Sequence, residues 1–214
     1  MNISQESYKL FLASLLAGDR QQCYNIVNTH WENENSLLNL YEELLKKAMY
    51  EIGNLWEVNQ ISVAAEHLAS GIIESILNDL QTKLKNSPNS NNRILSGCVE
   101  NEYHQIGIKM ISDVFEKNGW KSYFLGANIP TKELLQFAKI IQPQLFALSL
   151  SIYSHLPDLE EMIIQIRSVF PQIKIVVGGQ AFRHGGVKTI EKYENIVLLK
   201  DTYQTEEFIK TFDL

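Results

Sequence analysis

Glu102 and His104 have the residue types and the spacing of a metal-binding pair. They lie two positions apart in a polar stretch, residues 100–107, directly after an apolar segment. A neutral imidazole is a good ligand for a transition metal, and a carboxylate behind it can hold the ring in one tautomer. A lone loop histidine is more often solvated, so this pair needs support from other residues.

Small hydroxyl side chains and paired glycines follow two later apolar segments. Ser149 and Ser151 end the first, and Gly178 and Gly179 end the second. Taken singly, such serines satisfy backbone groups and such glycines make turns. Glycine also lets the backbone approach a ligand closely. Together with the histidine, these residues suggest a ligand with a bulky, flat part.

The second half of the chain contains the elements that must position these residues. Five short segments rich in apolar or β-branched residues predict strands at Arg93–Val99, Lys121–Leu125, Leu145–Ser151, Lys174–Val177 and Ile196–Leu199. Helical patterns lie between them at Ile108–Asn118, Thr131–Ile141 and Leu159–Val169, with Thr131 expected as an N-cap. This alternation predicts a parallel five-stranded sheet of flavodoxin-like, Rossmann-like order. Ligands bind such sheets at the carboxyl ends of the first and third strands, where the histidine and the serines fall.

The first half reads as helical throughout. Residues 4–86 contain no proline, and apolar residues recur at helical spacing. Helices are predicted at 4–17, 19–31, 36–54 and 62–85, and their short connections favour an antiparallel four-helix bundle. The fold class is therefore α followed by α/β. The polar stretch 87–92 is expected to be a linker between a helical domain, 1–86, and a sheet domain, 93–214.

Composition excludes several function classes. The formal net charge is −6 and basic residues form no long run, which argues against direct binding of nucleic acid. Residues 1–10 do not read as a signal peptide, and no apolar run reaches membrane-spanning length, so we expect a cytoplasmic protein that does not bind membranes. Cys23 and Cys98 form no metal-ligand pair. No nucleophile–base pair is evident, so any activity would belong to a cofactor.

The histidine stretch resembles a known motif. Glu-x-His-x-x-Gly, residues 102–107, resembles the Asp-x-His-x-x-Gly motif of cobalamin (vitamin B12)-binding domains related to methionine synthase. Forty-one residues separate Gly107 from Ser149, and twenty-six separate Ser151 from Gly178, which matches the family's spacing to its Ser-x-Leu and Gly-Gly motifs. The preceding helical bundle also resembles that family's cap.

The resemblance implies roles for these residues. His104 would replace the cofactor's own dimethylbenzimidazole below the cobalt, as the lower axial ligand. Ser149 would contact the displaced nucleotide tail, and Gly178 and Gly179 would line the slot that receives it. Gly107 belongs to the same cobalamin-binding set.

Two positions depart from the family pattern. Glu102, the expected partner of His104, stands where the family usually has aspartate, so its hydrogen bond to the histidine can differ. Ser151 stands where the family has leucine, which makes the tail slot more polar.

The bundle carries a second resemblance. Trp56, nine further residues and then Glu66-His67 resemble the Trp-x9-Glu-His pattern of light-sensing cobalamin regulators of the CarH and LitR kind. This implies that Trp56 covers the upper face of the cofactor and that Glu66 and His67 contact its adenosyl group. Two features differ: this sequence has no helix-turn-helix segment before the bundle, and Glu57 stands where some of these regulators have a histidine.

Three functions are compatible with these patterns. The favoured one is a free-standing, cobalamin-dependent sensor that binds adenosylcobalamin, responds to light, and signals through a protein partner or self-association. The second is a corrinoid carrier subunit of a methyltransferase system, for which methylcobalamin would be the relevant form. The third is a haem-binding or degenerate domain that serves as an interaction module.

Overall fold

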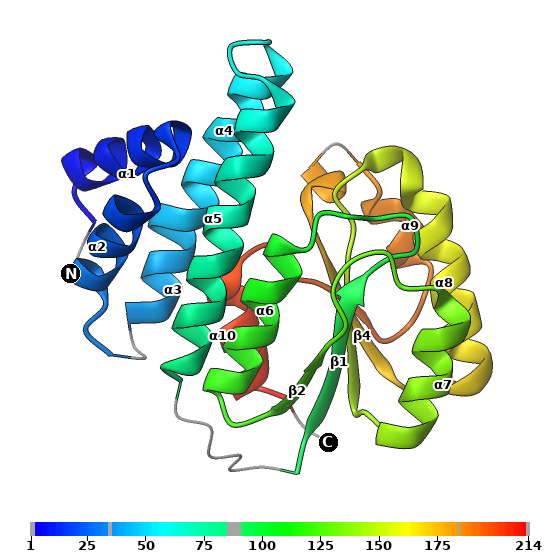
Figure 1. The fold of residues 1–214 in the computed structure, drawn as a ribbon. Helices are drawn as coiled ribbons and strands as arrows, with labels where there is room; N and C mark the ends of the chain where they lie inside the picture. The colour runs from blue at the N-terminus through cyan, green and yellow to red at the C-terminus, as the bar shows by residue number, and fades with distance from the viewer. Residues whose placement is uncertain (1–2, 34–35, 85–90, 184, 213–214) are drawn as a thin grey trace. The chain divides into compact units, whose positions relative to one another are not determined.

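The structure is a computed structural model that describes residues 3–33, 36–84, 91–183 and 185–212. The chain divides into two compact units, residues 1–85 and 86–214, which are described separately (Figure 1). Of the predicted linker, residues 87–90 lie outside the described residues, and the predicted domain boundaries stay a prediction. Within the described ranges, no helix has the length and apolar character needed to cross a membrane.

The first unit is built from helices, as predicted. They are α1 (Gln5–Ala17), α2 (Arg20–His30), α3 (Leu37–Asn39), a π-helical segment (Leu40–Lys46), α4 (Lys47–Glu57) and α5 (Val63–Thr82). The side chains of Ser4, Asp19 and Ser62 cap α1, α2 and α5 by accepting a backbone N–H from the first turn. The segment from α3 to α4 is helical throughout, so it corresponds to the single helix expected at 36–54.

The second unit contains a parallel five-stranded sheet in the order β2-β1-β3-β4-β5. Its strands are β1 (Arg93–Cys98), β2 (Lys121–Phe124), β3 (Leu145–Ser149), β4 (Lys174–Gly178) and β5 (Ile196–Leu198). This is the predicted flavodoxin-like order. The central strand β3 is buried along its whole length, as expected of a parallel sheet that is covered on both faces.

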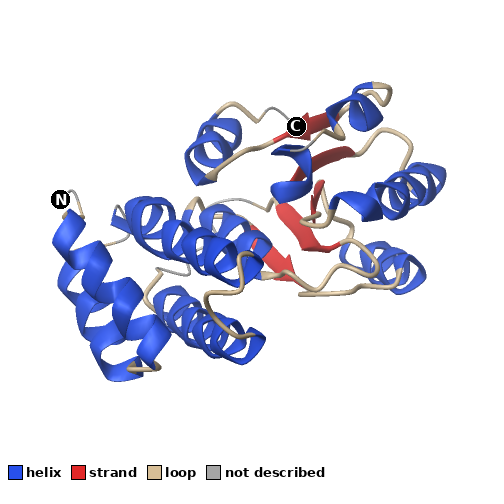
Figure 2. Cartoon of the chain, turned by 90° about the horizontal axis from the view of Figure 1, so that it is seen from above, coloured by secondary structure: helices blue, strands red, loops and turns tan. Residues whose placement is uncertain are grey.

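Helices cover both faces of this sheet (Figure 2). One face packs against α6 (Ile106–Lys117) and α10 (Thr202–Lys210), through a core that includes Phe115 and Trp120. The other packs against α7 (Thr131–Ile141), α8 (Leu156–Val169) and α9 (Val187–Glu191). Two short 3-10 turns precede α8 and α9, at Tyr153–His155 and Gln180–Arg183.

Some predicted boundaries are wrong. Thr131 is the first helical residue of α7 and Pro130, which provides no side-chain cap, occupies the N-cap position. The carboxylate of Glu100 binds the start of the helix instead. Its Oε2 accepts from the Thr131 backbone N–H at 3.1 Å and from the Thr131 hydroxyl at 3.2 Å. The third strand ends at Ser149 rather than Ser151.

Helix boundaries in the last third of the chain also differ from expectation. Helix α8 begins at Leu156 rather than Leu159, with proline at its start. Helices α9 and α10 were not predicted. Asp201 caps α10 by accepting from the Gln204 backbone N–H at 2.7 Å, so a local start signal for that helix was present in the sequence.

Gly179 is required by the packing of the sheet edge. Its φ is +114°, and a Cβ there would lie 2.1 Å from the carbonyl oxygen of Leu150. We expect Gly179→Ala to lower the free energy of unfolding by roughly 2–4 kcal/mol, because the backbone must shift and the conformation is strained. Urea unfolding followed by circular dichroism measures this change.

The matched control is Gly107→Ala in α6, where a Cβ would meet no atom within 4 Å. Without cofactor, this change should leave stability unaltered or raise it by up to about 1 kcal/mol. Equal unfolding midpoints for the two variants would contradict the explanation given for Gly179.

Candidate functional site

The candidate site lies where two neighbouring strands end. β1 and β3 pair in parallel, with Cys98 opposite Ser149, so the loops that follow them leave the sheet side by side. The strand order reverses between them, since β2 lies beyond β1 and β4 beyond β3. This is the switch point at which open α/β sheets bind ligands.

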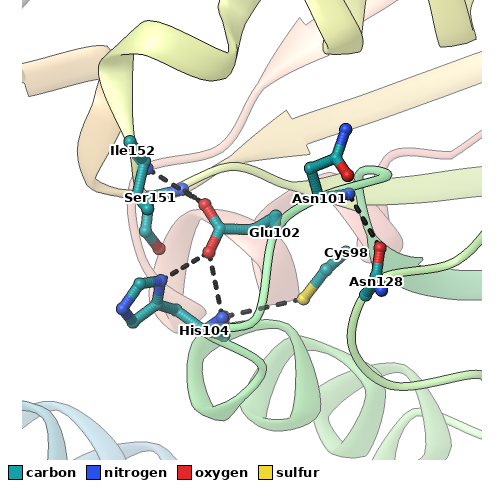
Figure 3. A network of polar contacts seen from close by, with 7 residues as sticks. All are labelled: Cys98, Asn101, Glu102, His104, Asn128, Ser151 and Ile152. Carbon is teal, nitrogen blue, oxygen red and sulfur yellow. Dashed lines mark hydrogen bonds and ion pairs between the residues drawn. The ribbon is translucent and has the colours of Figure 1, made fainter.

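Glu102 joins these two loops. Its side chain is fully buried, and its Oε2 accepts backbone N–H groups of Ser151 at 2.7 Å and Ile152 at 3.0 Å. Its Oε1 accepts the backbone N–H of His104 at 2.9 Å and contacts His104 Nδ1 at 2.5 Å (Figure 3). Both carboxylate oxygens therefore have two partners each, which compensates the cost of burying the charge.

The hydrogen bonds to Glu102 keep it ionised. Burial raises the pKa of this carboxyl, but the hydrogen bonds from His104, Ile152 and Ser151 outweigh it and hold the pKa at about 2. A permanent negative charge beside Nδ1 favours a proton on that nitrogen. The other ring nitrogen, Nε2, is then the one with a lone pair for a metal.

The His104 ring is accessible although its partner is buried. Its side chain is 62% exposed, and Figure 3 shows its far nitrogen pointing away from Glu102. The main chain of His104 is also fixed, since its carbonyl accepts the Cys98 thiol at 3.6 Å. Burial, together with the charge of Glu102, raises the pKa of Cys98 to about 12, so this thiol stays neutral.

The serines and glycines of the predicted set lie at the same edge of the sheet. Ser149 pairs with Gly178 across β3 and β4 and is buried, and the Ser151 backbone binds Glu102. The chain itself accounts for both glycines, because a Cβ on Gly178 would lie 2.9 Å from the Leu199 carbonyl oxygen and Gly179 abuts Leu150. Their contact with a nucleotide tail stays a prediction.

The cap residues lie at one end of the helical unit. Trp56 is in the last turn of α4 and is 49% exposed, while Glu66 ends the first turn of α5 and His67 follows it. Glu66 Oε2 contacts His67 Nδ1 at 2.8 Å, while its Oε1 accepts the Ser70 hydroxyl at 2.6 Å. Because α4 and α5 are joined by a short turn, these side chains belong to the same end of the bundle.

Family comparison identifies the sheet unit. A family model described as a B12 binding domain matches residues 92–199, and a second B12 binding domain model matches residues 8–81. The chain belongs to the B12-binding domain family. The match at 92–199 includes Glu102, His104 and the serine and glycine positions that follow.

The chain is similar to two kinds of protein, one named as a transcriptional repressor and the other as a corrinoid protein. It is 26% identical over 148 residues to the HTH-type transcriptional repressor CarH of Myxococcus xanthus, which covers 68% of this chain and 48% of that protein. It is also 26% identical over 147 residues to trimethylamine corrinoid protein 1 of Methanosarcina mazei, covering 65% and 67%. The chain thus spans about half the length of CarH.

The fold of the B12-binding domains is also found in a solved structure. The monomethylamine corrinoid protein of Methanosarcina barkeri superposes with a TM-score of 0.79 at 14% identity, covering 97% of this chain and 98% of that one. At this identity the likeness shows the fold alone. That fold is a helical region followed by a five-stranded parallel sheet with flanking helices.

The residues of this B12-binding chain fit a corrin at the candidate site. A corrin supplies the equatorial ligands of its cobalt and leaves axial positions, one of which an oriented, exposed imidazole such as His104 could occupy. Gly107 lies one turn away at the start of α6, where a Cβ would meet open space. No packing within the described residues requires glycine there, and its predicted contact with a bound cofactor stays a prediction.

Sequence reasoning missed several residues that hold the loop after β1. Glu100 caps α7, and Asn101 donates its backbone N–H to Asn128 Oδ1 at 2.9 Å. Both asparagines have positive φ, +68° and +48°, a conformation that asparagine tolerates better than most residues. The sequence offered only isolated asparagines in polar loops as a signal.

Replacing Glu102 should destabilise the cofactor-free protein. In Glu102→Gln the amide NH2 must face N–H donors, because each carboxylate oxygen accepts two of them. We expect a loss of about 3 kcal/mol in the free energy of unfolding near neutral pH, the size implied by the depressed pKa. Urea unfolding gives the value.

The effect should depend on pH with a definite sign. A depressed carboxyl pKa contributes stability that is present above the unfolded pKa, near 4.5, and is lost as pH falls towards about 2. The difference between wild type and Glu102→Gln should therefore shrink over that range. Glu191→Gln, at an exposed glutamate of α9, is the control. A constant difference at all pH values would contradict this account.

Proposed function

We propose that this chain binds cobalamin with His104 as the lower axial ligand of cobalt and Glu102 as the partner of that histidine. The observation that carries the proposal is the exposed ring of His104, 62% accessible, fixed through Nδ1 by a fully buried carboxylate. The hydrogen bond from Nδ1 orients the ring and raises the basicity of Nε2. Ser149, Ser151, Gly178 and Gly179 are proposed to receive the nucleotide tail, and Gly107 to lie against the corrin.

His104→Ala should abolish histidine coordination of cobalt. Electron paramagnetic resonance of the bound cobalt(II) form measures it, because an axial nitrogen splits the signal. Protein labelled with ¹⁵N-histidine should show a doublet pattern where unlabelled protein shows a triplet. The variant should lose this isotope effect and bind at least roughly 10-fold more weakly, since changes to groups that only support a metal ligand already cost about 10–100-fold.

The control is His30→Ala, at the histidine that ends α2, which should keep both affinity and splitting. If the splitting of wild-type protein does not respond to ¹⁵N-histidine, the ligand is not a histidine and the proposed role of His104 is wrong.

We propose further that the chain is a cobalamin-dependent sensor that favours adenosylcobalamin and responds to light. The supporting observation is the cap set, Trp56 with Glu66 and His67. Trp56 is half exposed, so its ring is available to cover a flat ligand, and Glu66 is held in place by Ser70 and His67. A carboxylate and an imidazole side by side suit hydrogen bonds to a ribose. CarH, a transcriptional repressor by name, is a relative, and a protein partner or self-association would transmit the signal.

Trp56→Ala tests the sensor role. We expect it to reduce the preference for adenosylcobalamin over methylcobalamin by about tenfold, equivalent to about 1.4 kcal/mol, since the ring no longer covers the upper ligand. Absorbance titration in the dark gives both affinities, and a second spectrum after green light tests for a stable, protein-bound photoproduct.

Trp31→Ala, at the residue that follows α2, is the matched control in the same unit and should leave the preference unchanged. If the adenosyl preference of Trp56→Ala equals that of wild type, Trp56 does not cover the upper ligand. If wild type gives no stable photoproduct, light is not the signal.

A corrinoid carrier role is the second candidate. It is favoured by the similarity to trimethylamine corrinoid protein 1 and by the match to the monomethylamine corrinoid protein over nearly the whole of both chains. Methyl transfer from the methylcobalamin-loaded chain to a thiol acceptor, dependent on an added methyltransferase, would support this role. A sensor would show no such turnover.

A further inference from the structure

In the loop that presents His104, each residue from 100 to 103 makes a hydrogen bond to another segment of the sheet unit. Glu100 caps α7 through Thr131, and the Glu102 side chain binds the loop after β3. Three further hydrogen bonds to this loop come from Asn128, in the loop between β2 and α7. This one residue contacts three consecutive residues of the histidine loop.

The contacts of Asn128 use its backbone and both polar atoms of its side chain. Its backbone N–H donates to the Glu102 carbonyl at 2.7 Å, and its Oδ1 accepts the Asn101 N–H at 2.9 Å. Its Nδ2 donates to the Tyr103 hydroxyl at 3.0 Å. Figure 3 shows the Asn101–Asn128 bond beside Glu102 and His104. Asn101 Nδ2 in turn donates to Asp158 Oδ2 at 3.3 Å, which ties the loop to α8.

The two hydrogen bonds of the Asn128 side chain contribute little to the stability of the fold. Tyr103 is 67% exposed and Asn101 is exposed, so water competes for both bonds. The positive φ of Asn128 does not account for the side chain either, because glycine would adopt that conformation more readily. The contribution of the Asn128 side chain is to fix the backbone of residues 101 to 103 in one conformation.

We propose that Asn128 is a positioning residue for coordination of cobalt by His104, an inference that rests on the proposed function. A ligand held in place beforehand binds without the cost of ordering its loop. With the Asn128 side chain in place, residues 101–103 are fixed on one side and Glu102 fixes His104 on the other. Without it, the Asn101 backbone and the Tyr103 hydroxyl lose their bonds to Asn128, and only the Asn128 backbone bond to Glu102 remains between the two loops at this point.

Asn128→Gly is the test variant, because it removes Oδ1 and Nδ2 while keeping the backbone bond and suiting the positive φ. We expect its affinity for cobalt(II) cobalamin to fall about tenfold, as two modest hydrogen bonds are lost. Its electron paramagnetic resonance spectrum should become a mixture of forms with and without the ¹⁵N-histidine splitting. The change in thermal unfolding temperature of the cofactor-free protein should be small.

Two further variants make the test specific. Asn128→Asp keeps an acceptor for the Asn101 N–H and offers a second one to the Tyr103 hydroxyl, which then donates, so it should restore the wild-type spectrum. Asn195→Gly is the control, since Asn195 also has a positive φ, +57°, but precedes β5 at the opposite edge of the sheet. It should leave affinity and spectrum unchanged.

The outcomes separate this inference from the proposed function. If wild type shows the histidine splitting and Asn128→Gly shows it undiminished, with unchanged affinity, then Asn128 has no positioning role and His104 stays the ligand. The same holds if Asn128→Gly is merely less stable while its bound cobalt spectrum is that of wild type. If wild type itself lacks the splitting, both inferences fall.

Discussion

One buried carboxylate, that of Glu102, is the interaction on which the site depends. Burying its charge is tolerable only because four N–H groups meet it, two from each of two loops. Those loops can meet only if β1 and β3 are neighbours, so the sheet order is a condition for the carboxylate as much as for the ligand. The exposed His104 ring is in turn fixed by a group that cannot move without leaving backbone donors unpaired.

Glutamate in place of the family's aspartate has a structural consequence. The carboxylate of Glu102 both contacts His104 Nδ1 and accepts from the backbone of Ser151 and Ile152. Glutamate is one methylene longer than aspartate, and with this length its carboxylate contacts the His104 ring as well as the loop after β3. Orientation of the ring is thereby linked to the path of the loop after β3. The side chain at Ser151 does not matter for this link, because its backbone is the donor.

Much of the fold could be predicted from sequence, and the reasons are local. Short apolar segments alternating with helical patterns gave the strands and their order, and the two-residue spacing of Glu102 and His104 indicated their pairing. Backbone donors such as those of Ser151 and Ile152 leave no signature in residue type, so that part of the site was not predictable. Asn128 could not be predicted for a related reason, because its contacts form only when the loop between β2 and α7 meets the loop after β1. Helix α10 was not predicted, although Asp201 followed three residues later by Gln204 is a sequence pattern typical of a helix start.

The glycines show why a motif must be interpreted position by position. Gly179 is explained by the chain itself, since its Cβ would collide with Leu150, and it would be needed with or without a ligand. Gly107 has no such explanation, because a Cβ there would meet nothing. A glycine that lowers helix stability and relieves no clash supports the proposal that a bound group approaches the chain there. Gly107 and His104 both lie after β1, so the proposed close approach of the corrin and the proposed metal ligand fall in one stretch of the chain.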